Sequence, residues 1–190
     1  SDCRRFKRKE RRMKFRDLTA DEIECRVAKV SDKGAQILLY KNARVDANIL
    51  DETVGADNWQ NRFYECKGNL YCSVGINTNF GKTEKPERWI WKDDCGTESF
   101  TEKEKGEASD AFKRACVNLG IGRELYSAPQ ILVDLGNKEY AEDGVTKNGK
   151  PKYRANSWLK FRVSAITYNA ERSIIGLSIA DNNGNIRFTL

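Results

Sequence analysis

Two periods of apolar residues run along this chain, and each predicts its own kind of element. Apolar residues at every second position are typical of strands with one buried face, and spacings of three and four are typical of helices. The segments "ECRVAKV" and "AQILLY" flank "SDKG", which predicts two strands joined by a tight turn at residues 32–34. Just before them, Thr19 and Glu22 have the spacing of a capping box and predict a short helical turn.

Three further strands with short connections are predicted in "WQNRFYEC", "LYCSVGIN" and "RWIWKDDCG". In the second of them, Leu70, Cys72, Val74 and Ile76 alternate with polar or small residues, which indicates one buried face. Short connections between successive strands favour antiparallel pairing. The sequence therefore predicts an antiparallel meander.

A short helix is predicted before the meander. In "VDANILDETVG", Ala47, Leu50 and Val54 lie on one face, and Gly55 is a favourable residue for the end of the helix.

A longer helix is predicted after the meander, in "EKGEASDAFKRACVNLG". Thr101 and Glu104 have the spacing of a capping box at its start, and Gly120 and Gly122 follow its end. Its apolar stripe contains three alanines, so its backbone can approach a sheet closely. The stripe consists of Ala108, Ala111, Phe112, Ala115, Cys116 and Leu119.

The last third of the chain is less regular. Residues 136–157 are polar and hold three glycines and a proline, which predicts a loop or linker. The following residues alternate again from Leu159 to Ala165, and "NNGN" at 182–185 is a strong hairpin signal. We expect an α+β fold with a β-β-β-α core, in which the meander packs on the long helix, and with an N-terminal hairpin and a C-terminal β add-on. The predicted division is a basic tail (1–16), a core domain (17–135), a loop or linker (136–157) and a C-terminal β segment (158–190).

The positive charge is concentrated at the N-terminus. The net charge is +6, and residues 1–12 contribute seven Lys or Arg and two acidic residues, so the rest of the chain is almost neutral. This tail is either a solvated, flexible segment or an arm that binds nucleic acid.

Composition argues against several classes of function. The chain has no histidine, and its six cysteines are widely spaced, so neither a zinc site nor a Ser-His or Cys-His catalytic pair is expected. No glycine-rich phosphate loop is present, and no apolar run approaches the length of a membrane helix. We expect no catalytic residue, metal or cofactor, and we expect reduced cysteines in an intracellular protein.

Lys113 and Arg114 are the most informative cations. Both lie off the apolar stripe of the long helix, about 100° apart around its axis. Arg114 is explained either by an ion pair with Asp110, four residues earlier, or by an external anion. Lys113 has Ser109 at that spacing, so no acidic neighbour explains it.

Other cations and aromatic residues could join such a surface. Arg44 and Lys41 lie at the start of the short helix, where a cation is unfavourable unless an anion binds. Arg44 could instead pair with Asp46 as a solvated turn residue. The meander offers a mixture of cations and aromatic rings, which either binds single strands or forms ordinary cross-strand pairs. Its members are Arg62, Tyr64 and Lys92, and Arg123 after the long helix completes the set.

Two stretches together resemble a known family. "YKNARVDANILDETVGADNWQ" and "KGEASDAFKRACVNLGIGRELY", with the meander between them, are similar to the core of the Rad-fifty-two family of single-strand annealing proteins, and most of all to its phage Sak-type branch. The resemblance covers residues 17–128 and implies assembly into rings or helical filaments. In such assemblies single-stranded DNA lies in a basic groove, with its backbone facing the protein and its bases facing outward. The resemblance also implies that neither ATP nor a metal is needed. By motif position it places Arg44, Lys113 and Arg114 in that groove.

The resemblance also implies partners and a setting. We expect a homo-oligomer in the cytoplasm of a bacterial host, encoded by a phage or prophage, with single-stranded DNA as ligand. Duplex DNA and a host or phage single-strand-binding protein are further candidate partners, and no membrane is involved. The alternatives are a passive module for single-stranded DNA or RNA and a metal-dependent nuclease, the latter suggested only by Glu65 and Lys67 in "ECK".

Overall fold

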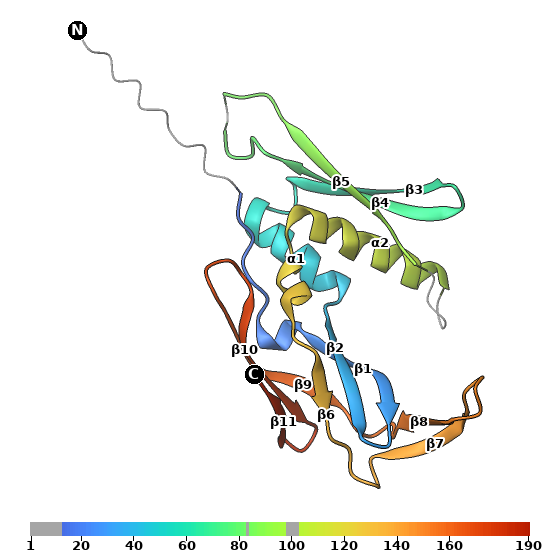
Figure 1. The fold of residues 1–190 in the computed structure, drawn as a ribbon. Coiled ribbons are helices and arrows are strands. Elements are labelled where there is room, and N and C mark those ends of the chain that lie inside the picture. Colours follow the sequence, from blue (N-terminus) through green and yellow to red (C-terminus); the bar gives the residue numbers. More distant parts are fainter. Residues whose placement is uncertain (1–12, 83, 98–102) are drawn as a thin grey trace.

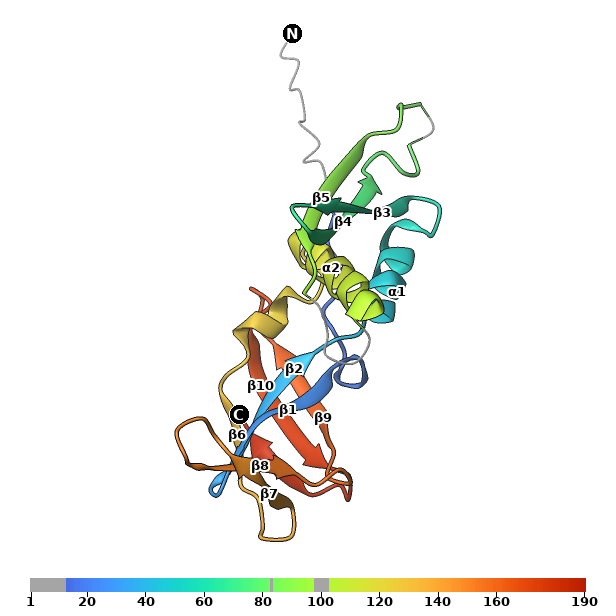
Figure 2. The same ribbon diagram turned by 90° about the vertical axis from the view of Figure 1, so that its right-hand side faces the viewer.

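The computed structural model of the chain describes residues 13–82, 84–97 and 103–190. Two helices lie between a small three-stranded sheet and a larger six-stranded sheet, and a two-stranded hairpin projects from the far end of the larger sheet (Figures 1 and 2). The helices are α1 (Ala43–Val54) and α2 (Lys103–Leu119), with the short 3-10 turns η1 (Ala20–Glu22) and η2 (Arg123–Ser127). The mostly antiparallel arrangement with two helices confirms the predicted α+β class.

The six-stranded sheet joins the two ends of the chain. Its order is β11-β10-β9-β1-β2-β6, and β1 pairs with β9 through Glu24 and Arg162. The predicted C-terminal β add-on therefore shares one sheet with the N-terminal hairpin. The strands are β1 (Glu24–Ser31), β2 (Gly34–Tyr40), β6 (Ile131–Val133), β9 (Phe161–Tyr168), β10 (Ile174–Asp181) and β11 (Ile186–Thr189).

The predicted meander is present and packs on α2. It consists of β3 (Trp59–Cys66), β4 (Asn69–Asn77) and β5 (Trp89–Cys95), paired antiparallel in that order. Cys72, Val74 and Ile76 of β4 are fully buried, as their alternation predicted.

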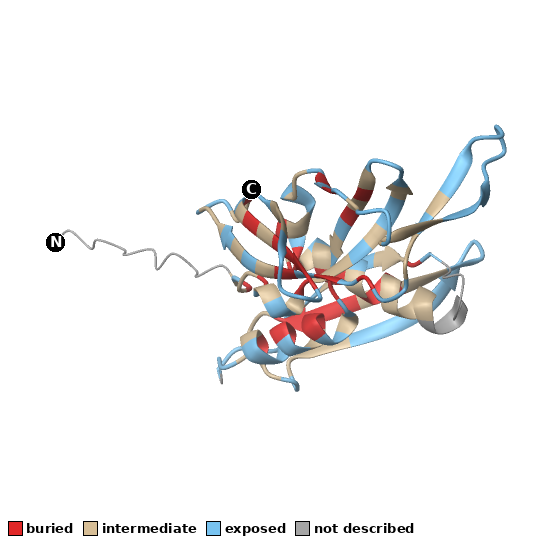
Figure 3. Ribbon diagram, turned by 90° about the horizontal axis from the view of Figure 1, so that it is seen from below, coloured by how far each residue is buried: buried red, intermediate tan, exposed pale blue. Residues whose placement is uncertain are grey.

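The close approach of α2 to the meander depends on small residues. Ala111, Ala115 and Cys116 on its apolar stripe are fully buried, and Figure 3 shows that buried residues are concentrated in the helices and the strands next to them. At the end of β5, Gly96 lies so near the α2 backbone at Glu107 that a Cβ there would overlap the carbonyl group. A capping box of Thr101 and Glu104 was predicted at the start of this helix. Thr101 and the side chain of Glu104 lie outside the described residues.

Helix α1 ends at the glycine that its sequence predicts, and it begins with a cap that was not predicted. The Asn42 side chain accepts hydrogen bonds from the backbone N–H groups of Arg44 and Val45, which caps the first turn. Gly55, with a φ of 87°, follows its last residue and donates its N–H to the Asp51 carbonyl group. The capping box of Thr19 and Glu22 is also confirmed.

The prediction of a loop or linker at 136–157 is wrong for most of that segment. It forms a hairpin of β7 (Tyr140–Val145) and β8 (Pro151–Ala155), with Tyr140 and Tyr153 packed edge to face. Both faces of this hairpin are largely exposed. Its strands therefore lack the alternation of apolar and polar residues by which a strand can be predicted from sequence. The division into domains stays a prediction, and the basic residues 1–12 of the tail lie outside the described residues.

Candidate nucleic-acid interface

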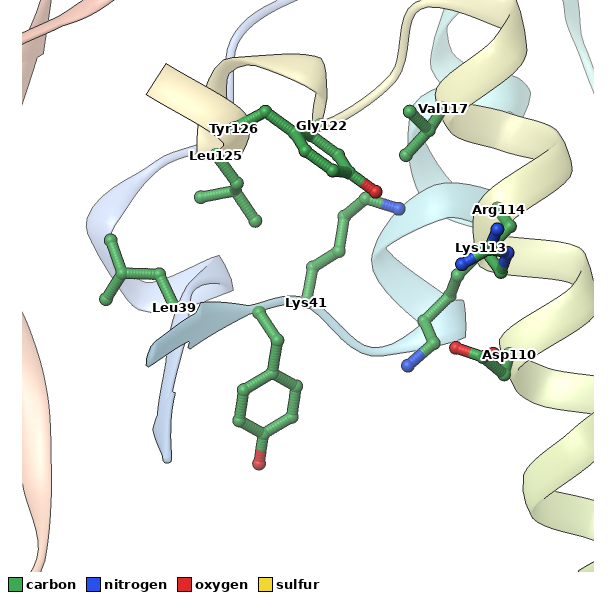
Figure 4. Close-up of a pocket in the computed structure, with 10 residues that line it drawn as sticks. Leu39, Lys41, Asp110, Lys113, Arg114, Val117, Gly122, Leu125 and Tyr126 are labelled. Atoms are coloured by element: carbon green, nitrogen blue, oxygen red, sulfur yellow. The ribbon is translucent and has the colours of Figure 1, made fainter. Parts of the chain in front are cut away.

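A pocket of about 300 Å³ opens where the end of β2, the outer side of α2 and the turn η2 meet (Figure 4). It combines cationic, aromatic and aliphatic side chains, which is the mixture that single-stranded nucleic acids require for phosphate and base contacts. Its walls are Leu39, Tyr40, Lys41, Asp110, Lys113, Arg114, Val117, Gly122, Leu125 and Tyr126.

Helix α2 presents Lys113 and Arg114 to this pocket. The neighbouring positions Ala111, Ala115 and Cys116 are fully buried, so the helix cannot rotate without breaking the core. Lys113 is half-buried and extends from α2 into the pocket in Figure 4, while the Arg114 side chain is 45% exposed. The prediction that both side chains avoid the apolar stripe is confirmed.

Arg114 has an acidic partner, but a different one from that expected. Its Nε donates to Asp94 of β5 at 3.2 Å, and this hydrogen bond raises the pKa of the guanidinium. Asp110 instead accepts hydrogen bonds from the backbone and hydroxyl groups of Thr97, both at 3.1 Å. An exposed pair of this kind contributes about 0–1 kcal/mol, so a phosphate can compete for the guanidinium.

Lys41 is not the surface cation that the sequence suggested. It is 4% exposed, and its Nζ donates to both carboxylate oxygens of the fully buried Asp46, at 2.5 and 2.6 Å. Burial raises the pKa of Asp46 to about 6, while the charges of Lys41 and then Lys113 oppose that shift. Direct phosphate binding by Lys41 is therefore replaced by a structural role, since its charge is already used beneath the pocket.

Gly122 closes over this buried pair. It is buried, its φ is 69°, and a Cβ at this position would overlap the end of the Lys41 stem. The sequence identified this glycine only as a helix stop, whereas the structure shows that it also leaves room for Lys41.

We expect Gly122→Ala to lower the free energy of unfolding by about 1–2 kcal/mol from the left-handed backbone alone, and by more from displacement of Lys41. Gly81 is a matched control, because its φ is 67° and a Cβ at that position would meet no atom within 4 Å. Urea unfolding of both alanine variants measures the difference. If both variants lose the same free energy of unfolding, the displacement of Lys41 adds nothing to the cost of Gly122→Ala.

Arg44 lies in the first turn of α1 and is exposed. Its suggested partner Asp46 is occupied by Lys41, and no ion pair joins Arg44 to any residue in the described part of the chain. Arg44 is not among the residues that line the pocket, although it follows the pocket residue Lys41 by three positions. Its contact with DNA stays a prediction.

Arg62 and Tyr64 lie on the other face of the meander. The strand register pairs them with Ser73 and Tyr71, which point away from α2. Here the Arg62 guanidinium stacks over the Trp91 ring at 4.3 Å, and Tyr64 and Tyr71 stack with ring centres 5.5 Å apart. The structure therefore does not bring these two predicted residues to the pocket.

Lys92 differs from them, because β5 pairs it with the buried Val74 and so places it on the α2 side of the meander. It is exposed on an edge strand, two residues before Asp94. Its predicted phosphate contact remains compatible with the fold.

Arg123 has a local role that the sequence did not reveal. Its guanidinium donates to the Val117 carbonyl oxygen at 3.2 and 2.8 Å, and to that of Asn118 at 3.2 Å. These carbonyl groups end α2, so Arg123 caps the helix and neutralises the negative end of its dipole. Arg123 is still exposed, and its DNA contact stays a prediction.

Two aromatic residues of the pocket were missed by the sequence analysis. Tyr126 is 74% exposed and Tyr40 is 38% exposed. Tyr40 ends β2 and Tyr126 lies in the 3-10 turn η2, and although they begin and end the two stretches that resemble the family, no periodic pattern distinguishes either of them. The signal in the sequence was their position, Tyr40 directly before Lys41 and Tyr126 at the end of "RELY", just after the Lys-Arg helix and its glycine stop.

The fold and the pocket together define an α+β protein with a cationic and aromatic surface held on a rigid helix. The chain belongs to the Rad52/22 family of double-strand break repair proteins, since the model of that family matches residues 14–143. Family membership associates it with DNA binding and annealing, and with recombination and repair. A search of curated proteins returned no match.

Two further observations concern the described residues only. No group of three or more His, Cys, Asp or Glu side chains in this part of the chain could hold a metal ion. None of its helices is long and apolar enough to cross a membrane.

Proposed function

We propose that this protein binds single-stranded DNA and anneals complementary strands during homologous recombination, without ATP and as a ring or helical oligomer. The observation that supports this most directly is the pair Lys113 and Arg114, which α2 presents beside one pocket in a chain of the Rad52/22 family. The phage Sak-type assignment stays a prediction from the resemblance.

The pocket suits a reaction that makes no covalent bond. Annealing requires that the phosphates be neutralised, that the strand be extended and that base edges stay free. Lys113 and Arg114 supply charge for phosphates, and α2 fixes their spacing because its opposite face is buried. Repetition of the pocket around an oligomer would turn two cations per subunit into a continuous track, so a nearly neutral domain could still bind tightly.

Three measurements on the wild-type protein test the proposal. We expect salt-sensitive binding of a single strand, faster pairing of complementary fluorescent strands without ATP, and a particle of many subunits by light scattering with DNA present. Binding without faster pairing would identify a passive binding module. A strict monomer in the presence of DNA would contradict the oligomeric part, and Mg²⁺-dependent loss of the strand would indicate a nuclease.

A further inference from the structure

Tyr126 is the most exposed large side chain in the pocket, at 74%. Its hydroxyl group has no hydrogen-bond partner among the residues that the structure describes, and its ring belongs to no cluster of the core. Neither packing nor hydrogen bonding within the described fold therefore explains an aromatic ring at this position.

The turn that carries Tyr126 is firmly held on both sides of it. Two residues earlier, the buried carboxylate of Glu124 accepts from the Leu18 backbone at 2.8 Å and from Arg172 at 2.9 Å. One residue later, the Ser127 hydroxyl donates to the Glu124 carbonyl oxygen at 2.7 Å and accepts from the Ile174 backbone at 2.9 Å. The backbone of η2 is thus fixed while the ring points outward. Binding of a ligand to the ring therefore costs little conformational entropy of this turn.

The surroundings of the ring indicate the chemistry of its ligand. In Figure 4 Tyr126 extends from η2 toward α2, the helix that carries Lys113 and Arg114. Leu125 and Val117 add apolar surface to the same pocket. Cations beside an aromatic ring and aliphatic side chains match the two parts of a nucleotide, a phosphate and a flat base.

We infer that Tyr126 is a stacking platform for one nucleobase of the bound strand, next to the phosphate contacts of Lys113 and Arg114. This inference rests on the proposed binding of single-stranded DNA and adds a base contact to it. One base held at each such pocket anchors the strand, while the bases on either side stay open for pairing. Because any base has an aromatic face, the contact does not restrict the DNA sequence.

The experiment compares two strands of equal length, one ordinary and one built of abasic residues, which keeps the phosphates and lacks the bases. We expect Tyr126→Ala to weaken binding of the ordinary strand by about 5- to 150-fold, and to bind the abasic strand as the wild type does. The salt dependence of binding should not change, because no charge is removed. Tyr126→Phe keeps the ring and should bind like the wild type.

Trp158→Ala is the control, because Trp158 is 50% exposed and does not line the pocket. Circular dichroism and light scattering of each variant report on fold and assembly. The inference is overturned if Tyr126→Ala binds the ordinary strand like the wild type, if it weakens both strands equally, or if the weaker binding accompanies a smaller assembly. The last result would place the ring in a contact between protein chains. Failure of the wild type to bind either strand would instead overturn the proposed function, and this inference with it.

Discussion

Replacing Lys113 and Arg114 together by alanine should weaken binding of single-stranded DNA by about 25-fold at 0.1 M salt. Each cation that neutralises a phosphate of a single strand contributes about 0.7 to the slope of log affinity against log salt, so two of them contribute about 1.4. Titrations of a labelled strand at several salt concentrations measure both the affinity and the slope. The structure supports this expectation because both side chains border one pocket.

The fold should survive this double substitution. Arg114 is exposed, and its pair with Asp94 is of the kind that contributes about 0–1 kcal/mol, while the buried stripe of α2 is untouched. Lys147→Ala with Lys150→Ala removes the same charge from the tip of the exposed β7–β8 hairpin and serves as the control. An unchanged slope in the Lys113 and Arg114 variant, or an equal change in the control, would remove these residues from the interface.

The periodic parts of the fold could be predicted from the sequence. The stripe of α2 and the alternation in β4 each bury a continuous face, so their spacing records their environment directly. The capping box of η1 and the glycine that ends α1 are equally local, because Thr19 and Gly55 bond within their own turns. Such features depend on residues a few positions apart.

The roles of individual cations could not be predicted, because they depend on distant segments. Arg114 bonds Asp94, twenty residues earlier, across the α2–β5 contact, and the buried Lys41 lies against Gly122, 81 residues later in the chain. The Arg123 side chain donates to a carbonyl group at the end of α2, whereas a fully solvated arginine would make no such hydrogen bond. The sequence identified the candidate cations, but only the tertiary structure separates those that border the pocket with exposed charge from those bonded within the fold.

The C-terminal strands show the same dependence on long-range contacts. Arg172, in the β9–β10 turn with a φ of 66°, forms an ion pair with Asp17, donates to the Gly120 carbonyl oxygen at 2.9 Å and bonds the buried Glu124. It thereby ties the end of α2 and the turn η2 to the N-terminal segment. The segment that the sequence suggested was an add-on thus supports one wall of the pocket.

The buried pair beneath the pocket provides the second large prediction. Lys41→Met should lower the free energy of unfolding by about 3–5 kcal/mol at pH 7.5, because it leaves the Asp46 carboxylate buried without its partner. For a chain of this length that corresponds to a fall of roughly 6–20 °C in the unfolding temperature. Lys33→Met, at an exposed lysine in the β1–β2 turn, is the control and should change stability little.

The loss of free energy of unfolding in Lys41→Met, relative to the wild type, should be larger at high pH than at low pH. Burial already raises the pKa of Asp46 to about 6 in the wild type, and Lys41 opposes that rise, so its removal should raise the pKa further. The folded variant then binds a proton that the unfolded chain, with an ordinary pKa near 3.8, releases. As the pH rises above 3.8, stability attributable to Asp46 falls in the wild type until about 6 and in the variant until its higher pKa, so the deficit should grow above pH 6 and be larger at pH 8 than at pH 5.

A second substitution distinguishes a lost ion pair from simple loss of packing. Lys41→Met combined with Asp46→Leu removes both charges, and should recover most of the stability and abolish the pH dependence of the deficit. Urea unfolding of the wild type, both single variants and the double variant at pH 5 and pH 8 completes the cycle. If the double variant is as unstable as Lys41→Met, or if the deficit does not change with pH, the stem of Lys41 rather than its charge supports the floor of the pocket.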